Sequence, residues 1–98
     1  MRVEWDPAKD KANQGKHGLS FEEASELFKV DVDYLEMYDE EHSNEEDRFI
    51  AIGPIKRGVI VVVYTERAED VLRILSSRMA TRKEVDQFEK FERKGHGG

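Results

Sequence analysis

Two cations lie where a helix is predicted to begin, in the last fifth of the chain. Thr81 and Glu84 have the spacing of a capping box, so we expect a helix over residues 81–93. Its first turn carries Arg82 and Lys83, although the helix dipole favours acidic residues at this end. A positively charged helix N-terminus is suited to holding an anion such as a phosphate. The alternative is that both side chains point into solvent at a small cost in stability.

More cations occur in the neighbouring stretches of the chain. Guanidinium groups neutralise phosphate charge well, and the ribose 2′-hydroxyl of RNA is a built-in nucleophile, so a cluster of cations can cleave RNA without a metal ion. We divide the cations of this region between two roles. The candidates for catalysis are Arg67, Arg78 and Arg82. The candidates for binding RNA are Lys56, Arg57, Arg73 and Lys83.

Cleavage of this kind also needs groups that transfer protons. Glu66, directly before Arg67, is a candidate general base, and His17 is the best-placed side chain of the type that titrates near neutral pH. His17 is equally suited to the end of a helix, so a capping role is an alternative. Antiparallel strand order permits Arg78 to lie at the opposite end of a sheet from Arg67. The sequence therefore does not gather these residues into one site.

Several other kinds of chemistry have no support in the sequence. The chain has no cysteine, which excludes a thiol nucleophile, a disulfide framework and a thiolate metal site. Its three histidines are dispersed without metal-ligand spacing, and no glycine-rich phosphate loop is present. We therefore expect neither a metal nor another cofactor.

Length and composition indicate a small protein with a single core. The 98 residues suffice for one domain, which we expect over residues 1–94, followed by a flexible tail at 95–98. The hydrophobic fraction is 38% and the charged fraction 39%, so the core must be thin. The longest apolar run, residues 59–64, is far shorter than the ~20 residues that cross a bilayer, and the chain does not begin with a signal-peptide pattern. We expect a cytoplasmic protein.

The net charge of −6 is unevenly distributed along the chain. Residues 30–47 contain nine acids and no Lys or Arg, whereas the rest of the chain has 13 acids and 16 Lys and Arg residues. This asymmetry is compatible with one face for a nucleic acid and another for a basic partner. The alternative is a solvated acidic loop with ordinary surface cations.

Hydrophobic periodicity and capping signals predict five strands and three helices. The expected strands span residues 1–5, 32–38, 48–55, 59–65 and 71–78. The expected helices begin at Asp6, Ser20 and Thr81, and Gly18 ends the first of them. These elements favour an α+β fold in which a small twisted, mainly antiparallel sheet, with strand 59–65 at its centre, has two N-terminal helices and one C-terminal helix. We expect the helices to cover one face and the other face to stay partly open.

Four segments of the chain resemble the BrnT family, toxins of bacterial toxin–antitoxin operons. They are EWDPAKDKANQGKHGLSFEEA at 4–24, RFIAIG at 48–53, VVYTER at 62–67 and ILSSRMATRKE at 74–84. The match covers nearly the whole chain in register. The combination of WDPxK, KHGxSFEEA and SRxATRKE is far more specific than any one short motif.

The resemblance implies a fold similar to that of RelE-type toxins and an endoribonuclease activity that halts translation. It also implies a cognate, BrnA-like antitoxin with a ribbon-helix-helix domain. In the toxin–antitoxin complex, this antitoxin would be the subunit that contacts operator DNA. Carried onto this sequence, the TER motif places a functional arginine at Arg67, and SRMATRKE offers Arg78 and Arg82. The KHG motif adds Lys16 as a residue that binds RNA and His17 as a catalytic candidate.

The acidic segment at residues 30–47 is unusual for a protein that cleaves RNA, and we assign it to antitoxin contact or to no function. A second hypothesis for the whole chain is a binding module without catalysis. Such a degenerate toxin would act only in an antitoxin complex that regulates transcription. Cleavage of RNA by the pure protein would favour the first hypothesis, and a tight complex without cleavage would favour the second.

Overall fold

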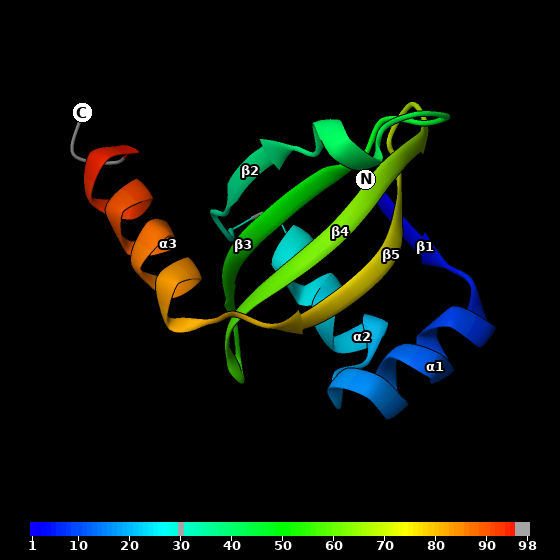
Figure 1. Cartoon of the computed structure of the whole chain (residues 1–98), viewed down its shortest axis with the longest axis horizontal. Helices are drawn as coiled ribbons and strands as arrows, with labels where there is room; N and C mark the ends of the chain where they lie inside the picture. The colour runs from blue at the N-terminus through cyan, green and yellow to red at the C-terminus, as the bar shows by residue number, and fades with distance from the viewer. Residues whose placement is uncertain (30, 96–98) are drawn as a thin grey trace.

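A computed structural model gives the structure of residues 1–29 and 31–95 (Figure 1). The elements are β1 (Arg2–Trp5), α1 (Pro7–His17), α2 (Phe21–Ala24), η1 (Ser25–Phe28), β2 (Leu35–Tyr38), η2 (Glu40–His42), β3 (Phe49–Ile55), β4 (Gly58–Ala68), β5 (Val71–Met79) and α3 (Arg82–Gly95), where η marks a 3-10 helix. None of the helices in this part of the chain has the length and apolar character needed to cross a membrane.

The five strands form one sheet in the order β1-β5-β4-β3-β2. Strands β2 to β5 form an antiparallel meander, and β1 adds to its edge in parallel to β5, which agrees with the predicted, mainly antiparallel sheet. The most apolar strand, β4, lies at the centre, as predicted. Pro54 of β3 pairs with Val59 of β4, while the pairing of β3 with β2 ends at Ile52. Beside Pro54 there is thus no β2 residue to which an amide hydrogen could have donated, so the sheet loses no hydrogen bond to the proline.

The helix ends follow the local chemistry of the sequence. The Asp6 carboxylate accepts a hydrogen bond from the Ala8 N–H at 2.9 Å, and Gly18 closes α1 with φ of 67°, a conformation that glycine adopts without strain. Ser20 and Glu23 form a complete capping box at α2. The predicted starts of the first two helices and the predicted stop at Gly18 are therefore confirmed.

The arrangement of the helices corrects one prediction. Helices α1 and α2 cover one face of the sheet, where Phe21 packs in the larger core cluster, but α3 lies on the opposite face. Its Phe88 packs against Ile52 and Val61, a cross-strand pair whose side chains point away from α1 and α2. Because the centre of the sheet is apolar on both sides, one layer of helices cannot keep it from water.

Several boundaries also differ from the expected ones. The first strand of the meander begins at Leu35, not at residue 32, and β4 continues through Ala68 into a two-residue turn. The acidic connection contains the short helix η2. Gly95 belongs to α3, and residues 96–98 of the expected tail lie outside the described residues.

Asn13 makes the buried polar connection between α1 and the sheet. Its amide nitrogen donates to the carbonyl oxygens of Leu19 and Ser77, both at 2.9 Å, and to the Ser77 Oγ at 3.0 Å. Its side-chain oxygen accepts from the Ser77 N–H at 3.2 Å. The residue is only 8% exposed, so water cannot replace these bonds.

We predict that Asn13→Ala lowers the free energy of unfolding by about 2–3 kcal/mol, because it leaves buried donors and acceptors at Leu19 and Ser77 without partners. Urea unfolding followed by circular dichroism measures this. The control is Gln14→Ala, a change at an exposed position of the same helix, which should cost less than about 0.5 kcal/mol. Equal stability of the two variants would contradict the account.

Candidate functional site

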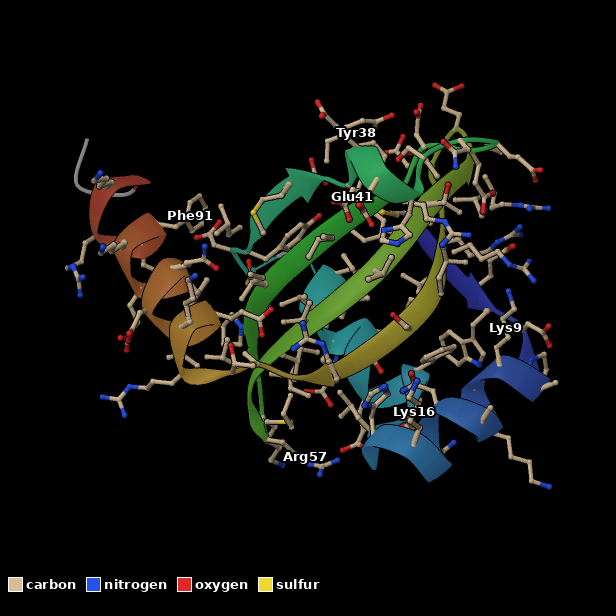
Figure 2. The ribbon with its side chains drawn as sticks, in the orientation of Figure 1. Lys9, Lys16, Tyr38, Glu41, Arg57 and Phe91 are labelled. Atoms are coloured by element: carbon tan, nitrogen blue, oxygen red, sulfur yellow. The ribbon has the colours of Figure 1, made fainter. Side chains whose placement is uncertain are left out.

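Seven of the residues predicted to bind or cleave RNA come from elements that meet at one end of the sheet, which we call the basic end. They are Lys16 and His17 of α1, Lys56 and Arg57 of the β3–β4 turn, Arg78 of β5, and Arg82 and Lys83 of α3. The turn and the start of α3 meet here, because the Ala80 N–H donates to the Val59 carbonyl at 3.0 Å. The side chains of Lys16 and Arg57 lie at this end of the molecule (Figure 2).

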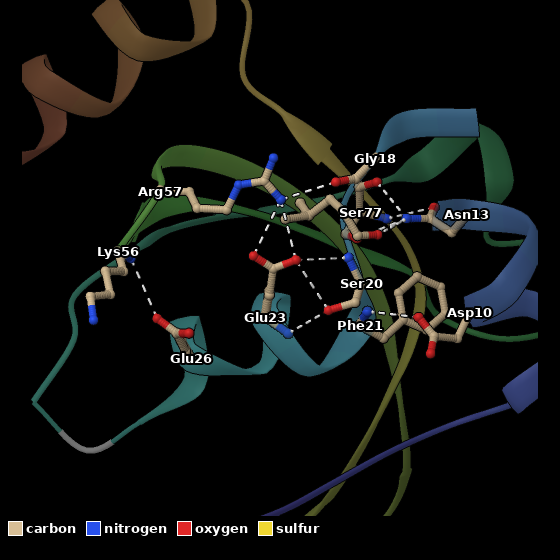
Figure 3. A network of polar contacts seen from close by, with 11 residues as sticks. Asp10, Asn13, Gly18, Ser20, Phe21, Glu23, Glu26, Lys56, Arg57 and Ser77 are labelled. Carbon is tan, nitrogen blue, oxygen red and sulfur yellow. Dashed lines mark hydrogen bonds and ion pairs between the residues drawn. The ribbon is translucent and has the colours of Figure 1, made fainter. Parts of the chain in front are cut away.

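Arg57 is engaged in holding the fold together. Its Nη1 donates to the Gly18 carbonyl at 3.0 Å and to both oxygens of the Glu23 carboxylate at 3.2 Å (Figure 3). The Ser20 N–H and Arg57 both donate to this carboxylate and hold the pKa of Glu23 below its usual value. Arg57 thus ties the β3–β4 turn to the junction between α1 and α2, and less of its charge is available to a ligand.

Arg78 forms a bidentate ion pair with Glu84. Its Nη1 and Nη2 donate to the two carboxylate oxygens at 2.7 and 2.8 Å. The same carboxylate accepts from the Thr81 N–H at 2.8 Å, which completes the predicted capping box together with the bond from the Glu84 N–H to the Thr81 Oγ1. Hydrogen bonds from Arg78 and Thr81 lower the pKa of Glu84 to about 2, and the pair with Glu84 raises the pKa of Arg78.

Arg82 and Lys83 are exposed at the start of α3. The Arg82 side chain is 93% exposed, and its one ion pair with the described residues is a distant contact of 3.9 Å with Asp86. Lys83, Lys16 and His17 make no side-chain hydrogen bond or ion pair with the described residues. These four side chains are therefore free to bind a phosphate at the basic end.

The other predicted residues lie at the opposite end of the sheet. Glu66 and Arg67 stand near the tip of the β4–β5 hairpin, where Ala68 pairs with Val71. Glu66 pairs with Leu72, and α1 is anchored at Ser77, so Glu66 and the C-terminal turn of α1 are roughly 17 Å apart along β5.

The structure therefore does not bring Glu66 and His17 together as base and acid. Successive residues of a strand point to opposite faces, which also turns Glu66 away from the side of the sheet that Arg67 occupies. Arg73 lies mid-strand, where its Nη1 donates to Glu4 of β1 at 2.9 Å.

A groove that the sequence analysis missed lies on the α3 side of the sheet. It has a volume of about 350 Å³. Its lining residues are Lys9, Asp39, His42, Arg48, Val63, Leu75 and Ser76. The His42 Nδ1 lies 2.9 Å from an Asp39 carboxylate oxygen. Asp39 directly precedes the short helix η2, and His42 is its last residue. The signal for it in the sequence is an acid and a histidine three residues apart, inside the acidic segment at residues 30–47.

No three His, Asp or Glu side chains gather as metal ligands among residues 1–29 and 31–95.

Comparisons with known proteins identify the relatives of this chain. The model of a family described as "Ribonuclease toxin, BrnT, of type II toxin-antitoxin system" matches residues 5–84. A crystal structure of the Brucella abortus ribonuclease toxin BrnT has 25% sequence identity to the chain and a TM-score of 0.61, and the alignment covers 84% of this chain and 99% of that one. No functionally curated protein matches the sequence.

The pair between Arg78 and Glu84 makes a prediction about acid stability. Glutamine still caps a helix, so Glu84→Gln removes the charge and keeps the cap. A carboxylate whose pKa is lowered in the folded state stabilises the fold at pH values above its ordinary pKa of 4.5. This stabilisation is lost as the pH falls towards 2. We expect the variant to be less stable by about 1 kcal/mol at pH 7, a value reduced for solvent screening, and most of this difference to be gone at pH 3.

Urea unfolding of both proteins at pH 7 and pH 3 measures the difference. The control is Glu89→Gln at an exposed position of the same helix, which should leave stability unchanged at both values. A difference between the Glu84 variant and the parent that is the same at pH 7 and pH 3 would refute the ion pair.

Proposed function

Because the chain belongs to the BrnT family of ribonuclease toxins of type II toxin–antitoxin systems, we propose that it is an endoribonuclease that cleaves RNA without a metal ion. The observation that carries this proposal is the family match over residues 5–84, which include β2 to β5 and the start of α3. We also propose that the fold is of the RelE type and that RNA cleavage in the cytoplasm inhibits translation.

The basic end suits the phosphate backbone of RNA. Arg82 and Lys83 lie beside the amide groups of the first turn of α3, and both favour an anion. Lys16 and His17 add further charge or hydrogen-bond donors from α1. The protein then needs to align the ribose 2′-oxygen with the phosphorus, neutralise the charge of the pentacoordinate transition state and move two protons. None of these tasks requires a metal.

The partner that we propose is a BrnA-like antitoxin with a ribbon-helix-helix domain. A type II system implies a protein antitoxin that neutralises the toxin. The net charge of −6 disfavours direct binding of this chain to duplex DNA. We therefore propose that operator DNA is contacted by the antitoxin alone.

We predict that the purified full chain, freed of antitoxin, cleaves total bacterial RNA in a buffer that contains EDTA. The 5′ fragments should end in a 2′,3′-cyclic phosphate, because the 2′-oxygen is the nucleophile. End mapping and mass spectrometry of the products measure this. Intact RNA together with a tight antitoxin complex would favour the non-catalytic binding module, and loss of cleavage in EDTA would contradict metal independence.

Arg82→Ala tests the basic end in the same assay. The exposed side chain contributes little to folding, so the variant should fold normally and cleave about tenfold or more slowly, as expected for one lost charged contact to phosphate. Arg93→Ala removes an exposed arginine from the last turn of the same helix and is the matched control. Equal rates for the two variants would remove Arg82 from the site.

A further inference from the structure

The acidic loop between β2 and β3 is held in a defined shape. The Asp39 N–H donates to the Arg48 carbonyl at 2.9 Å, the Ser43 Oγ donates to the Asp39 carbonyl at 2.5 Å, and the Arg48 N–H donates to the Ser43 Oγ at 3.0 Å. Asp47 is fixed from outside the loop, because the Thr65 Oγ1 donates to its carbonyl at 2.6 Å. This part of the acidic segment is therefore fastened to β3 and β4.

One result of this shape is an oriented histidine at the edge of the groove described above. The Asp39 side chain is 15% exposed, and its oxygens lie 2.9 and 3.2 Å from the His42 Nδ1. The His42 side chain is 62% exposed, and its Nε2 makes no hydrogen bond to the described residues. A carboxylate that holds Nδ1–H leaves Nε2 as a proton acceptor directed away from the carboxylate.

The groove also contains charges that suit a phosphate. Arg48 lies between the loop and β3 and lines the groove, and its guanidinium makes no hydrogen bond or ion pair with the described residues. Lys9, from the first turn of α1, lines the groove as well. Ser76 lies two residues before Arg78 on the same face of β5, so the groove is roughly 7 Å along the strand from the basic end.

We propose that this groove is the catalytic centre of the ribonuclease, with His42 as the general base that Asp39 orients and with Arg48 and Lys9 as the groups that neutralise the phosphate. This inference rests on the proposed function and adds the place where the reaction occurs. RNA bound to Arg82 and Lys83 at the basic end would reach the groove across Arg78 and Ser76 on one face of the sheet.

The reaction in the groove balances without any further reactant. The His42 Nε2 takes the proton of the ribose 2′-hydroxyl, and the 2′-oxygen forms a bond to phosphorus. The bond from phosphorus to the 5′-oxygen then breaks, and the departing oxygen takes a proton from water in the open groove. The imidazolium returns its proton to the hydroxide so formed, which leaves a 2′,3′-cyclic phosphate and a 5′-hydroxyl. The guanidinium of Arg48 and the ammonium of Lys9 stabilise the charge of the transition state.

The first test compares His42→Ala with Glu40→Ala, an exposed residue of the same short helix that lines no wall of the groove. The substrate is a short RNA that spans a site mapped in total RNA with the parent protein. General bases contribute about 10²–10⁴-fold, so His42→Ala should be slower by that factor and Glu40→Ala should match the parent. Imidazole added to the buffer should restore part of the lost rate, which a merely structural role of His42 would not produce.

The second test is the dependence of the parent's cleavage rate on pH. The groups that face His42 from the surrounding elements are Asp39, Glu41, Glu45, Glu46, Arg48 and Lys9. The rate should rise with pH across the range in which histidine side chains titrate. Asp39→Asn should slow cleavage, because an uncharged amide stabilises the imidazolium formed in the reaction less well than the carboxylate does.

Each outcome supports or overturns the inference. Full activity of a folded His42→Ala variant would overturn the assignment of the groove and leave the ribonuclease proposal intact. Loss of activity without rescue by imidazole and without the expected pH profile would also overturn the role of His42 as base. Intact RNA with the parent protein would overturn the proposed function and this inference together.

Discussion

The requirement that the central strand be covered on both faces determines most of this structure. Strand β4 has the run of residues 59–64, in which every side chain is apolar or aromatic, and successive side chains point to opposite faces. Ile60, Val62 and Tyr64 lie in the core under α1 and α2, whereas Val61 lies in the core under α3. Because α3 packs over only part of the second face, the rest of that face is left open as the floor of a groove. One packing requirement thus yields both the core and an open groove on the second face.

The local elements could be predicted from the sequence because their signals involve neighbouring residues. The capping residues Asp6, Ser20 and Thr81 and the stop at Gly18 all act within one helical turn. The side of the sheet on which α3 lies was predicted wrongly, although the information was present. A continuous apolar run indicates a strand buried on both faces, and that reading requires a second layer of helix.

The types of the candidate site residues could be predicted from the sequence, but their arrangement in space could be predicted only in part. Lys16 and His17 lie near Arg57, far from them in the sequence, because Asn13 fastens α1 to β5 and Arg57 donates to the Gly18 carbonyl at the end of α1. Two arginines of the basic end have carboxylate partners that depend on tertiary structure. The fold brings Glu23 to Arg57, and it orients Glu84 towards Arg78. His42 was not predicted as a candidate, because the negative charge of the acidic segment suggested a partner surface. The path of the loop over the sheet depends on the long-range bond from the Thr65 Oγ1 to the Asp47 carbonyl, which no local pattern predicts.

In the proposed mechanism, RNA lies on the α3 side of the sheet, from the basic end to the groove. The most direct measurement is NMR of the full chain, labelled with ¹⁵N, during titration with an RNA oligonucleotide whose 2′-O-methyl groups prevent cleavage. If RNA binds there, the largest changes in amide shifts will occur around His42, Arg48, Ser76 and Arg82. Changes confined to the opposite side, around Trp5, Phe28 and Tyr34, would contradict it.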